Sequence, residues 1–309
     1  MSYKAFASVL ILIFGLAGAN FGQNSPAEPN GPRLIIRTDD IGFCHGVNMA
    51  FKRAAEQGMV SSASVIVTTP WLDEAVEILK QHPEISVGLH LALNSEWKEF
   101  KWGPVTPYDK VPSLVDPSGK FYGTRKEFFS HKPKIKEVAK ELRAQIDLAL
   151  KKGLKVSYID NHMSTAISTK EFQQEMEKIA KEYGIGISRY FGEQEVTNVY
   201  AIAPEQKLAQ ALKNLDTITH GGLYLLVCHI GTDDAEMQAM TDLNLFGPKN
   251  MSKHRQAERD VLCDASYKAA LQARGIRLVG YKDLVGQIEM KRPFVSEKYE
   301  DVVKKSLAK

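Results

Sequence analysis

Short apolar runs alternate with longer amphipathic segments along most of this chain. Runs rich in Val, Ile and Leu are typical of strands buried on both faces, and an apolar period of 3.6 residues is typical of covering helices. The predicted strands are residues 33–38, 62–69, 85–91, 155–160, 184–188, 223–228 and 276–280. The predicted helices are residues 47–57, 72–81, 135–152, 170–183, 204–214 and 253–274. This alternation predicts an α/β protein with a parallel sheet, either open and doubly wound or closed into an incomplete (β/α) barrel.

The sequence predicts one folded domain. No break in composition and no second linker interrupts the pattern, so we expect a single domain over residues 33–290 and a C-terminal tail over residues 291–309. Residues 94–134 form a loop rich in Pro, Gly and aromatic residues that is too long for a simple connector. We expect this loop to cap a functional site.

The N-terminus has the pattern of an export signal. Lys4 precedes an apolar stretch over residues 5–17 that is short for a membrane span, and Ala17-Gly18-Ala19 offers a small-x-small cleavage site. We predict a signal peptide over residues 1–19 and a flexible leader over residues 20–32, hence a periplasmic or secreted protein without a stable membrane anchor. The alternatives are an uncleaved anchor and a buried first helix.

Composition excludes little and favours a globular protein. The chain has 309 residues, of which 44% are hydrophobic and 25% charged, so it can bury a large core. The net charge is only +3, and basic residues are interspersed with acidic ones without an aromatic-studded basic stripe. Nucleic acid is therefore not a predicted partner. A homodimer is compatible with the sequence.

The three cysteines are too few for a disulfide scaffold. Cys44 and Cys228 each lie within a few residues of a candidate site group, so a disulfide between them is one option. Small buried thiols are the favoured interpretation, because neither cysteine has a zinc-type CxxC partner. The core must then hold the fold together.

Four predicted strands end in acidic or imidazole side chains. These endings are Asp39-Asp40, Gly88-Leu89-His90, Asp160-Asn161-His162 and Cys228-His229. Each taken alone has a structural explanation, as a helix cap or a hydrogen-bonded core histidine. In both candidate architectures, however, the carboxyl ends of the strands meet at one rim. Their coincidence therefore predicts a shared metal site.

The residue types narrow the chemistry. One carboxylate and two imidazoles leave open positions on a divalent ion, which then acts as a Lewis acid and holds water. This set suits Zn, Mn, Co or Fe, and Mg with added waters. Adjacent residues at a strand end cannot easily both bind the ion, so one of Asp39 and Asp40 is free as a general base. His229 could protonate a leaving atom or stabilise an oxyanion.

At this point the motifs resemble a known family, the YdjC-like (ChbG/HpnK) carbohydrate deacetylases. The blocks that carry the resemblance are residues 38–43, 46–48, 60–64, 88–91, 111–116, 160–162, 228–231, Arg255 with Glu258, and residues 275–284. They occur in order over nearly the whole predicted mature chain.

The resemblance implies a distorted, incomplete (β/α) barrel that resembles polysaccharide deacetylases and removes acetyl groups from N-acetylated sugars such as chitooligosaccharides. It also implies one divalent metal ion, with Mg or Zn favoured and Mn or Co as alternatives. Carried over by motif, Asp39 would be the base and His229 the second catalytic group. The ligands would be Asp40, His90 and His162.

Several residues depart from the family pattern and predict an altered pocket wall. His45 stands in place of a proline and Asn161 in place of a serine, and both are candidate substrate contacts. Met163-Ser164 replace histidines, and Ile230 replaces a proline. His45 could instead be a solvent-facing residue before the first helix.

Trp97 and Trp102 lie close to acids and lysines in the long loop, where an aromatic face could stack on a sugar ring. An equal alternative is that they pin the loop to the barrel. Two other functions also stay open: a different metal-dependent amidase or phosphoesterase, and an exported glycan-binding protein without turnover. The latter would have no use for a base beside the ligands.

Overall fold

The computed structural model describes residues 31–219, 221–244 and 247–292. The predicted signal peptide lies outside the described residues, as do residues 20–30 of the predicted leader and residues 293–309 of the predicted tail.

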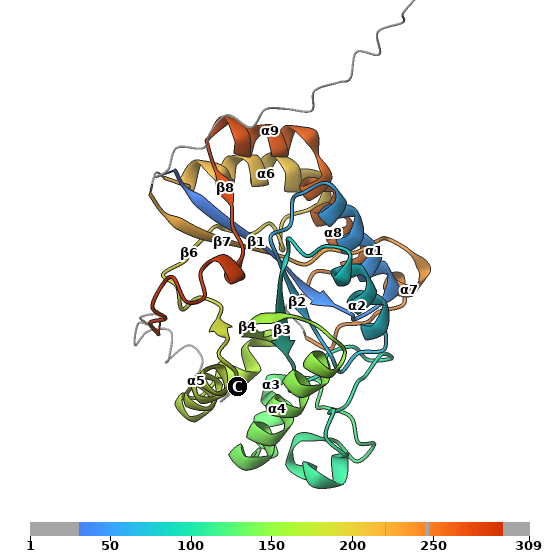
Figure 1. Ribbon diagram of the computed structural model, residues 1–309. Coiled ribbons are helices and arrows are strands. Elements are labelled where there is room, and N and C mark those ends of the chain that lie inside the picture. Colours follow the sequence, from blue (N-terminus) through green and yellow to red (C-terminus); the bar gives the residue numbers. More distant parts are fainter. Residues whose placement is uncertain (1–30, 220, 245–246, 293–309) are drawn as a thin grey trace, which may run out of the picture.

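The strands form one parallel sheet that curls into an incomplete barrel (Figure 1). Their order is β5-β4-β3-β2-β1-β7-β6, and β8 pairs with the start of β1. The strands are β1 (Arg33–Ile41), β2 (Ser62–Val65), β3 (Ser86–Leu91), β4 (Val156–Asn161), β5 (Gly186–Ile187), β6 (Gln194–Glu195), β7 (Leu223–Cys228) and β8 (Arg277–Leu278). The predicted incomplete barrel is confirmed, and the open doubly wound alternative is wrong. Strand β6 was not predicted because its two residues are polar and exposed.

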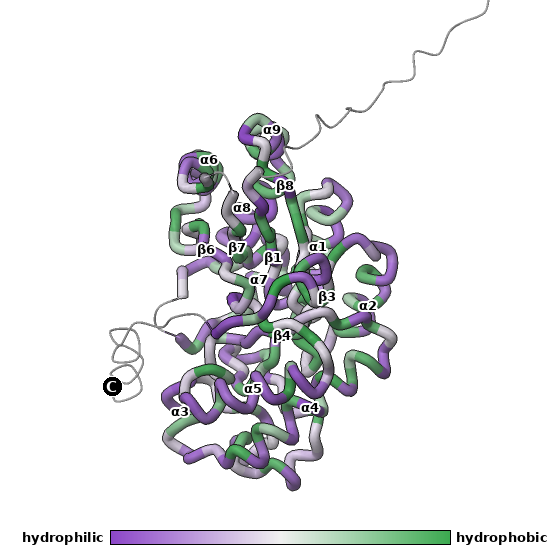
Figure 2. The backbone as a smooth tube through the Cα atoms, turned by 60° about the vertical axis from the view of Figure 1, so that its left-hand side comes forward, coloured by the Kyte–Doolittle hydropathy of each residue, from purple (hydrophilic) through white to green (hydrophobic). Residues whose placement is uncertain are grey.

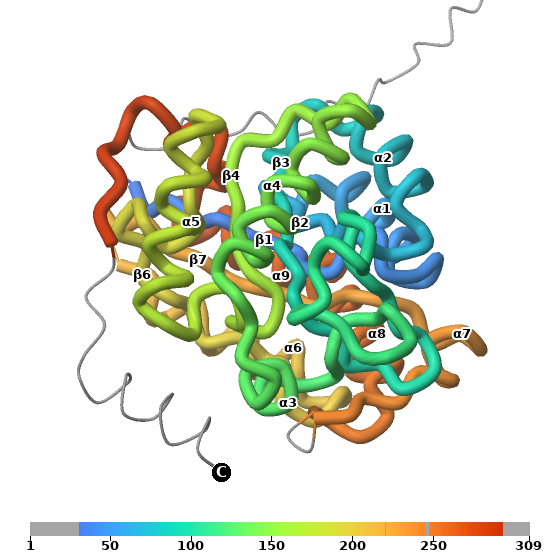
Figure 3. The backbone as a smooth tube through the Cα atoms, turned by 90° about the horizontal axis from the view of Figure 1, so that it is seen from below, coloured from blue at the N-terminus to red at the C-terminus, as the bar shows by residue number. Residues whose placement is uncertain are grey.

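Helices cover the outside of the sheet, with α1 and α2 on one side and α5 on the other (Figure 3). They are α1 (His45–Glu56), α2 (Leu72–Lys80), α3 (Arg125–Ser130), α4 (Ile135–Lys151), α5 (Lys170–Tyr183), α6 (Lys207–Asn214), α7 (Ala235–Gln238), α8 (Met251–Cys263) and α9 (Ala265–Ala273). The 3₁₀ helices are η1 (Tyr108–Lys110), η2 (Pro112–Leu114), η3 (His162–Ile167), η4 (Pro204–Gln206), η5 (Leu215–Thr217) and η6 (Tyr281–Asp283). Within the described ranges, no helix has the length and hydrophobicity to cross a membrane.

The prediction of one helix over residues 253–274 is wrong. Asp264 has an extended backbone between α8 and α9, and its side chain accepts a hydrogen bond from the backbone N–H of Ser266. It therefore caps a new helix instead of continuing the first. An apolar period that continues across a break does not reveal such a break.

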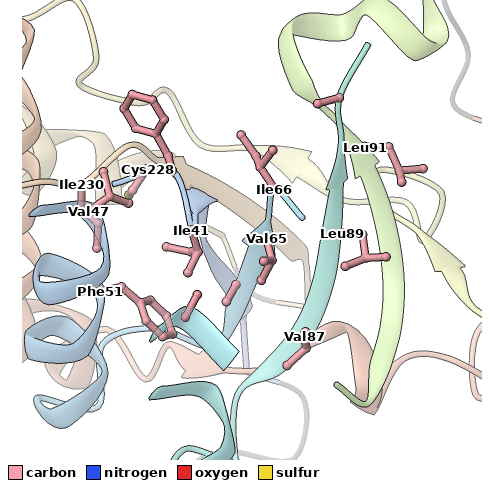
Figure 4. Packing of buried hydrophobic residues seen from close by; sticks show 14 of the residues in the cluster. Ile41, Val47, Phe51, Val65, Ile66, Val87, Leu89, Leu91, Cys228 and Ile230 are labelled. Atoms are coloured by element: carbon pink, nitrogen blue, oxygen red, sulfur yellow. The ribbon is translucent and has the colours of Figure 1, made fainter. Parts of the chain in front are cut away.

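The main core lies between the sheet and its helices. Val47 and Phe51 of α1 point toward Ile41 and Val65 of the neighbouring strands (Figure 4). Helices such as α4 and α5 mix hydrophobic and hydrophilic positions along their length, as expected for helices with one face on a core (Figure 2). Burial of this apolar surface is the dominant favourable term that holds the barrel wall together.

A second apolar cluster fills the inside of the barrel. Ile35 of β1, Tyr158 of β4 and Tyr281 of η6 belong to it, and the two tyrosine rings lie 4.1 Å apart. Side chains two residues further along a strand point to the same face. Arg37 and Asp160 therefore lie one pleat above this apolar floor, where the polar site begins.

Candidate metal centre and active site

A β-bulge brings Asp39 and Asp40 to the same cavity. Thr38 of β1 pairs with Ala63 of β2, and Ile41 pairs with Val65, so β1 has one extra residue here. Asp40 adopts a left-handed backbone with φ 66°, a conformation that Asp tolerates better than most residues. In a regular strand, adjacent side chains would point to opposite faces. The bulge instead lets both carboxylates line one pocket.

Three predicted ligands converge on one point. The Oδ1 atom of Asp40 lies 3.5 Å from Nε2 of His90 and 3.4 Å from Nδ1 of His162. All three side chains are buried, and Oδ1 of Asp40 has no hydrogen-bond partner. Two ligand atoms bound tetrahedrally to zinc lie about 3.3 Å apart, given bonds of about 2.05 Å. The donor types and the spacing therefore fit a divalent metal ion.

Carboxylates hold the far nitrogens of both histidines. Nδ1 of His90 lies 2.9 Å from Oδ1 of Asp160, and Nε2 of His162 lies 2.7 Å from Oε2 of Glu96. An ionised carboxylate can only accept, so each of these nitrogens donates its N–H. When the rings are neutral, the lone pairs of the other two nitrogens then face Asp40, as metal ligation requires.

The buried carboxylates of the site favour a positive charge at the ligand cluster. Burial alone would raise the pKa of Asp40, but the guanidinium of Arg255 and the ring of His162 hold it well below its usual range. Arg255 Nη2 donates to Oδ2 of Asp40 at 2.6 Å. Burial alone would lower the pKa of His162, but Glu96 and Asp40 raise it to about 10. A proton or a metal cation can satisfy this demand.

Asp39 is held by a guanidinium, and its Oδ2 atom lies 3.9 Å from Nε2 of His90. Arg37 donates from Nε and Nη2 to the two oxygens of Asp39, at 2.7 and 2.8 Å. Nη1 of Arg37 also lies 2.9 Å from Oδ2 of Asp160, so one buried arginine serves both carboxylates. This two-point contact fixes the orientation of Asp39 beside the cluster.

His229 follows β7 and lies near Asp39. Its Nε2 atom is 4.0 Å from Oδ2 of Asp39, and its side chain is 25% exposed. The ring packs edge-on against Tyr200, with the centroids 5.2 Å apart. Its backbone N–H donates to Oε2 of Glu258 at 2.8 Å. Asp39 and His229 can therefore contact the same small group in the cavity.

The three predicted ligands, Asp39 and His229 line one pocket. Its volume of about 710 Å³ is suited to a small organic ligand. Asn161, a predicted substrate contact, is part of the lining. So are Met163 and Ser164, both with left-handed backbones, at φ 51° and 59°. This part of the wall therefore carries an apolar and a hydroxyl side chain.

The YdjC family model, described as YdjC-like protein, matches residues 33–273. The chain belongs to the YdjC-like family. This confirms the resemblance that the motifs indicated.

Relatives of similar length are known. The chain is 28% identical over 260 residues to a carbohydrate deacetylase of Brevibacillus brevis, covering 82% of this chain and 99% of that protein. It is 27% identical over 270 residues to a carbohydrate deacetylase of Enterococcus faecalis, covering 82% and 98%. A crystal structure of a candidate cellobiose-phosphate cleavage protein from Enterococcus faecalis V583 superposes with a TM-score of 0.68. It is 26% identical and covers 83% of this chain and 99% of that one.

Two of the predicted substrate contacts, Trp102 and His45, lie outside the pocket lining, whereas Trp97 is part of it. Trp97 and Trp102 are buried, with 2% and 3% exposure, and both pack against Phe43. They pin the loop to the barrel, and of the two only Trp97 lines the pocket. His45 is exposed on α1 and pairs with Glu74 at 2.8 Å, outside the pocket lining.

The cysteines are free, so the optional disulfide is absent. Cys44 and Cys228 are both buried, and Sγ of Cys44 lies 3.2 Å from Sδ of Met237. The favoured interpretation, small buried thiols, is confirmed.

Sequence reasoning missed the roles of Arg37 and Glu96. Arg37 interrupts an apolar strand two residues before Asp39. A charged residue on the same face of the strand as Asp39 could have indicated a partner for that carboxylate. Glu96 lies in the long loop, where an acid beside Trp97 gave no indication of a contact with His162.

Proposed function

We propose that this protein is a metal-dependent hydrolase that removes acetyl groups from N-acetylated sugars and releases acetate and an amino sugar. One observation carries the proposal: the cluster of Asp40, His90 and His162 lies beside Asp39 and His229 in one pocket. The matched relatives of this YdjC-like chain are named carbohydrate deacetylases. Chitooligosaccharides and related glycans are the proposed substrates.

A bound divalent ion would supply a Lewis acid for the acetamide carbonyl and a site for water. Asp39 takes a proton from the attacking water, whose oxygen bonds to the carbonyl carbon. The C–N bond then breaks, and His229 gives a proton to the departing nitrogen. The 4.0 Å separation of Asp39 and His229 supports this division of roles, because both reach the same small group.

We propose Zn or Mg as the ion, with Mn and Co as alternatives. Two imidazoles and one carboxylate suit Zn, Mn and Co, and Mg could bind to the same set with added waters. We also propose that the protein is exported to the periplasm or secreted, and that a homodimer is compatible with its activity.

The test is acetate release from N-acetylated mono- to oligosaccharides, with chelator and with each metal added back. The proposal expects release that the chelator abolishes and a metal restores. Phosphate release from sugar phosphates, without acetate release, would favour a phosphoesterase. Sugar binding that is unchanged in chelated protein, without turnover, would favour a glycan-binding protein.

A further inference from the structure

The charged side chains that line the pocket are nearly all paired. Its three arginines each contact an acid: Arg37 binds Asp39, Arg189 binds Glu195, and Arg255 binds Asp40. Glu96 contacts His162 in the same way. Among the described residues, every arginine of the lining is therefore in an ion pair, although Nε and Nη1 of Arg255 have no hydrogen-bond partner.

Asp242 is the exception among the acids of the lining. No basic side chain of the described residues lies within ion-pair distance of its carboxylate. Its Oδ1 atom accepts both the backbone N–H and the side-chain N–H of Asn244, at 2.7 and 2.8 Å. Oδ2 accepts from neither of them and lies beside Gly247. Burial raises the pKa of Asp242 and the nearby charge of Glu96 adds to this effect, whereas the hydrogen bonds from Asn244 and the charge of Arg255 oppose it. A cation at the carboxylate would relieve the cost of burial and the repulsion from Glu96.

The backbone fixes Asp242 close to the metal centre. It forms an antiparallel bridge with Trp97, flanked by hydrogen bonds from Lys98 N to Thr241 O at 2.9 Å and from Leu243 N to Glu96 O at 2.8 Å. Glu96 in turn holds His162. Asp242 is thus one residue across this bridge from the group that supports a predicted metal ligand. Asp242 and the predicted ligands line the same pocket, so a substituent of a glycan bound there can meet its carboxylate.

We propose that Asp242 forms a subsite for an ammonium group, so that the preferred substrate is a partially N-deacetylated glycan with a free amine beside the acetylated unit. This inference rests on the proposed function and names its substrate class. An ammonium donates up to three hydrogen bonds and neutralises the carboxylate, whereas a hydroxyl donates one and leaves the charge.

The test measures binding of two β-linked N-acetylglucosamine disaccharides, one fully acetylated and one with a single free amine, by calorimetry at pH 6. The sugar amine is protonated there. The zinc-loaded Asp39→Asn protein is used so that turnover does not consume the ligands. We expect about tenfold tighter binding of the amine-bearing disaccharide, the usual effect of one charge-assisted hydrogen bond.

Adding Asp242→Asn should abolish this preference and leave binding of the fully acetylated disaccharide within about twofold. Asp109→Asn, the same substitution at an exposed residue outside the pocket lining, is the control and should keep the preference. A preference that survives Asp242→Asn, or an equal loss for both disaccharides, would overturn the subsite. Binding readouts separate the two proposals: acetate release by the unmodified protein without amine preference refutes only the subsite. An Asp242-dependent preference without acetate release refutes only the deacetylase.

Discussion

The Nε2 atom of His162 lies 2.7 Å from the Oε2 atom of Glu96, and both side chains are buried. His162 follows a barrel strand, whereas Glu96 belongs to the long loop over residues 94–134. The loop that supplies Glu96 and Trp97 to the pocket lining therefore also orients a predicted metal ligand. A carboxylate that holds the far nitrogen of a metal-binding histidine commonly sets the metal affinity.

Replacing Glu96 by Leu should weaken zinc binding by roughly 10- to 100-fold, because the ring of His162 loses the acceptor that fixes its N–H. Glu96→Gln keeps a neutral acceptor and should lose less. Competition with a chromophoric chelator measures both affinities. Glu99→Gln, which changes an exposed acid of the same loop, should bind zinc like the unchanged protein. Unchanged affinity in Glu96→Leu would contradict the orienting role.

The bulge in β1 predicts opposite consequences for two adjacent substitutions. Asp39→Asn should lower kcat by about 10²- to 10⁴-fold, the range for loss of a general base, and should keep zinc bound. Asp40→Asn should instead release zinc, because Asp40 supplies the carboxylate of the cluster. Metal content by atomic emission and acetate release measure the two effects. Zinc loss in Asp39→Asn with zinc retained in Asp40→Asn would reverse the assignment.

Metal binding should depend on pH through His162. The pKa of His162 is about 10 in the metal-free fold, against 6.5 for an ordinary imidazole. Protonation of His162 therefore stabilises the metal-free fold fully below pH 6.5, and this stabilisation is lost as the pH rises to 10. The pKa of His90 is raised too, through Asp160 and Asp39, although burial opposes this. Zinc must displace these protons, so zinc affinity should rise with pH between about 7 and 10. Calorimetry in buffers of different ionisation enthalpy measures the protons released; a value of zero at pH 7 would contradict this prediction.

The sequence predicted the wall of the barrel and the ligands because both follow from repeating patterns. Apolar runs locate β1, β3, β4 and β7, and chemical groups at their carboxyl ends meet wherever a parallel sheet curls. His90, His162 and the pair Asp39-Asp40 could therefore be grouped without knowledge of the loops, whereas the choice of Asp40 as the ligand came from the family resemblance.

Contacts made by loops could not be predicted in this way. The spacing of Trp97 and Trp102 says nothing about whether their rings face solvent or Phe43, and only packing decides this. The bulge at Asp40 depends on the pairing of β1 with β2, which no local pattern records. Asp242 and Glu96 become neighbours through a single bridge between two loops, so neither could be assigned from the sequence.

A fully buried ion pair supports the backbone of His229. The ammonium of Lys207 lies 3.1 Å from Oε1 of Glu258, and it also donates to the carbonyls of Val199 and Tyr200. The second oxygen of Glu258 accepts the backbone N–H of His229. Two walls of the pocket, carrying Tyr200 and His229, are thus joined at one carboxylate.

Lys207→Met should destabilise the fold by about 3–5 kcal/mol, because it leaves the carboxylate of Glu258 buried without its cation. Adding Glu258→Leu should recover part of this loss, since both charges are then removed. The double variant lacks the acceptor for the backbone N–H of His229. Its kcat should therefore be low, although it is more stable than Lys207→Met. Urea unfolding and acetate release separate the two effects. A double variant with full kcat would mean that the carboxylate of Glu258 only balances Lys207 and does not position His229.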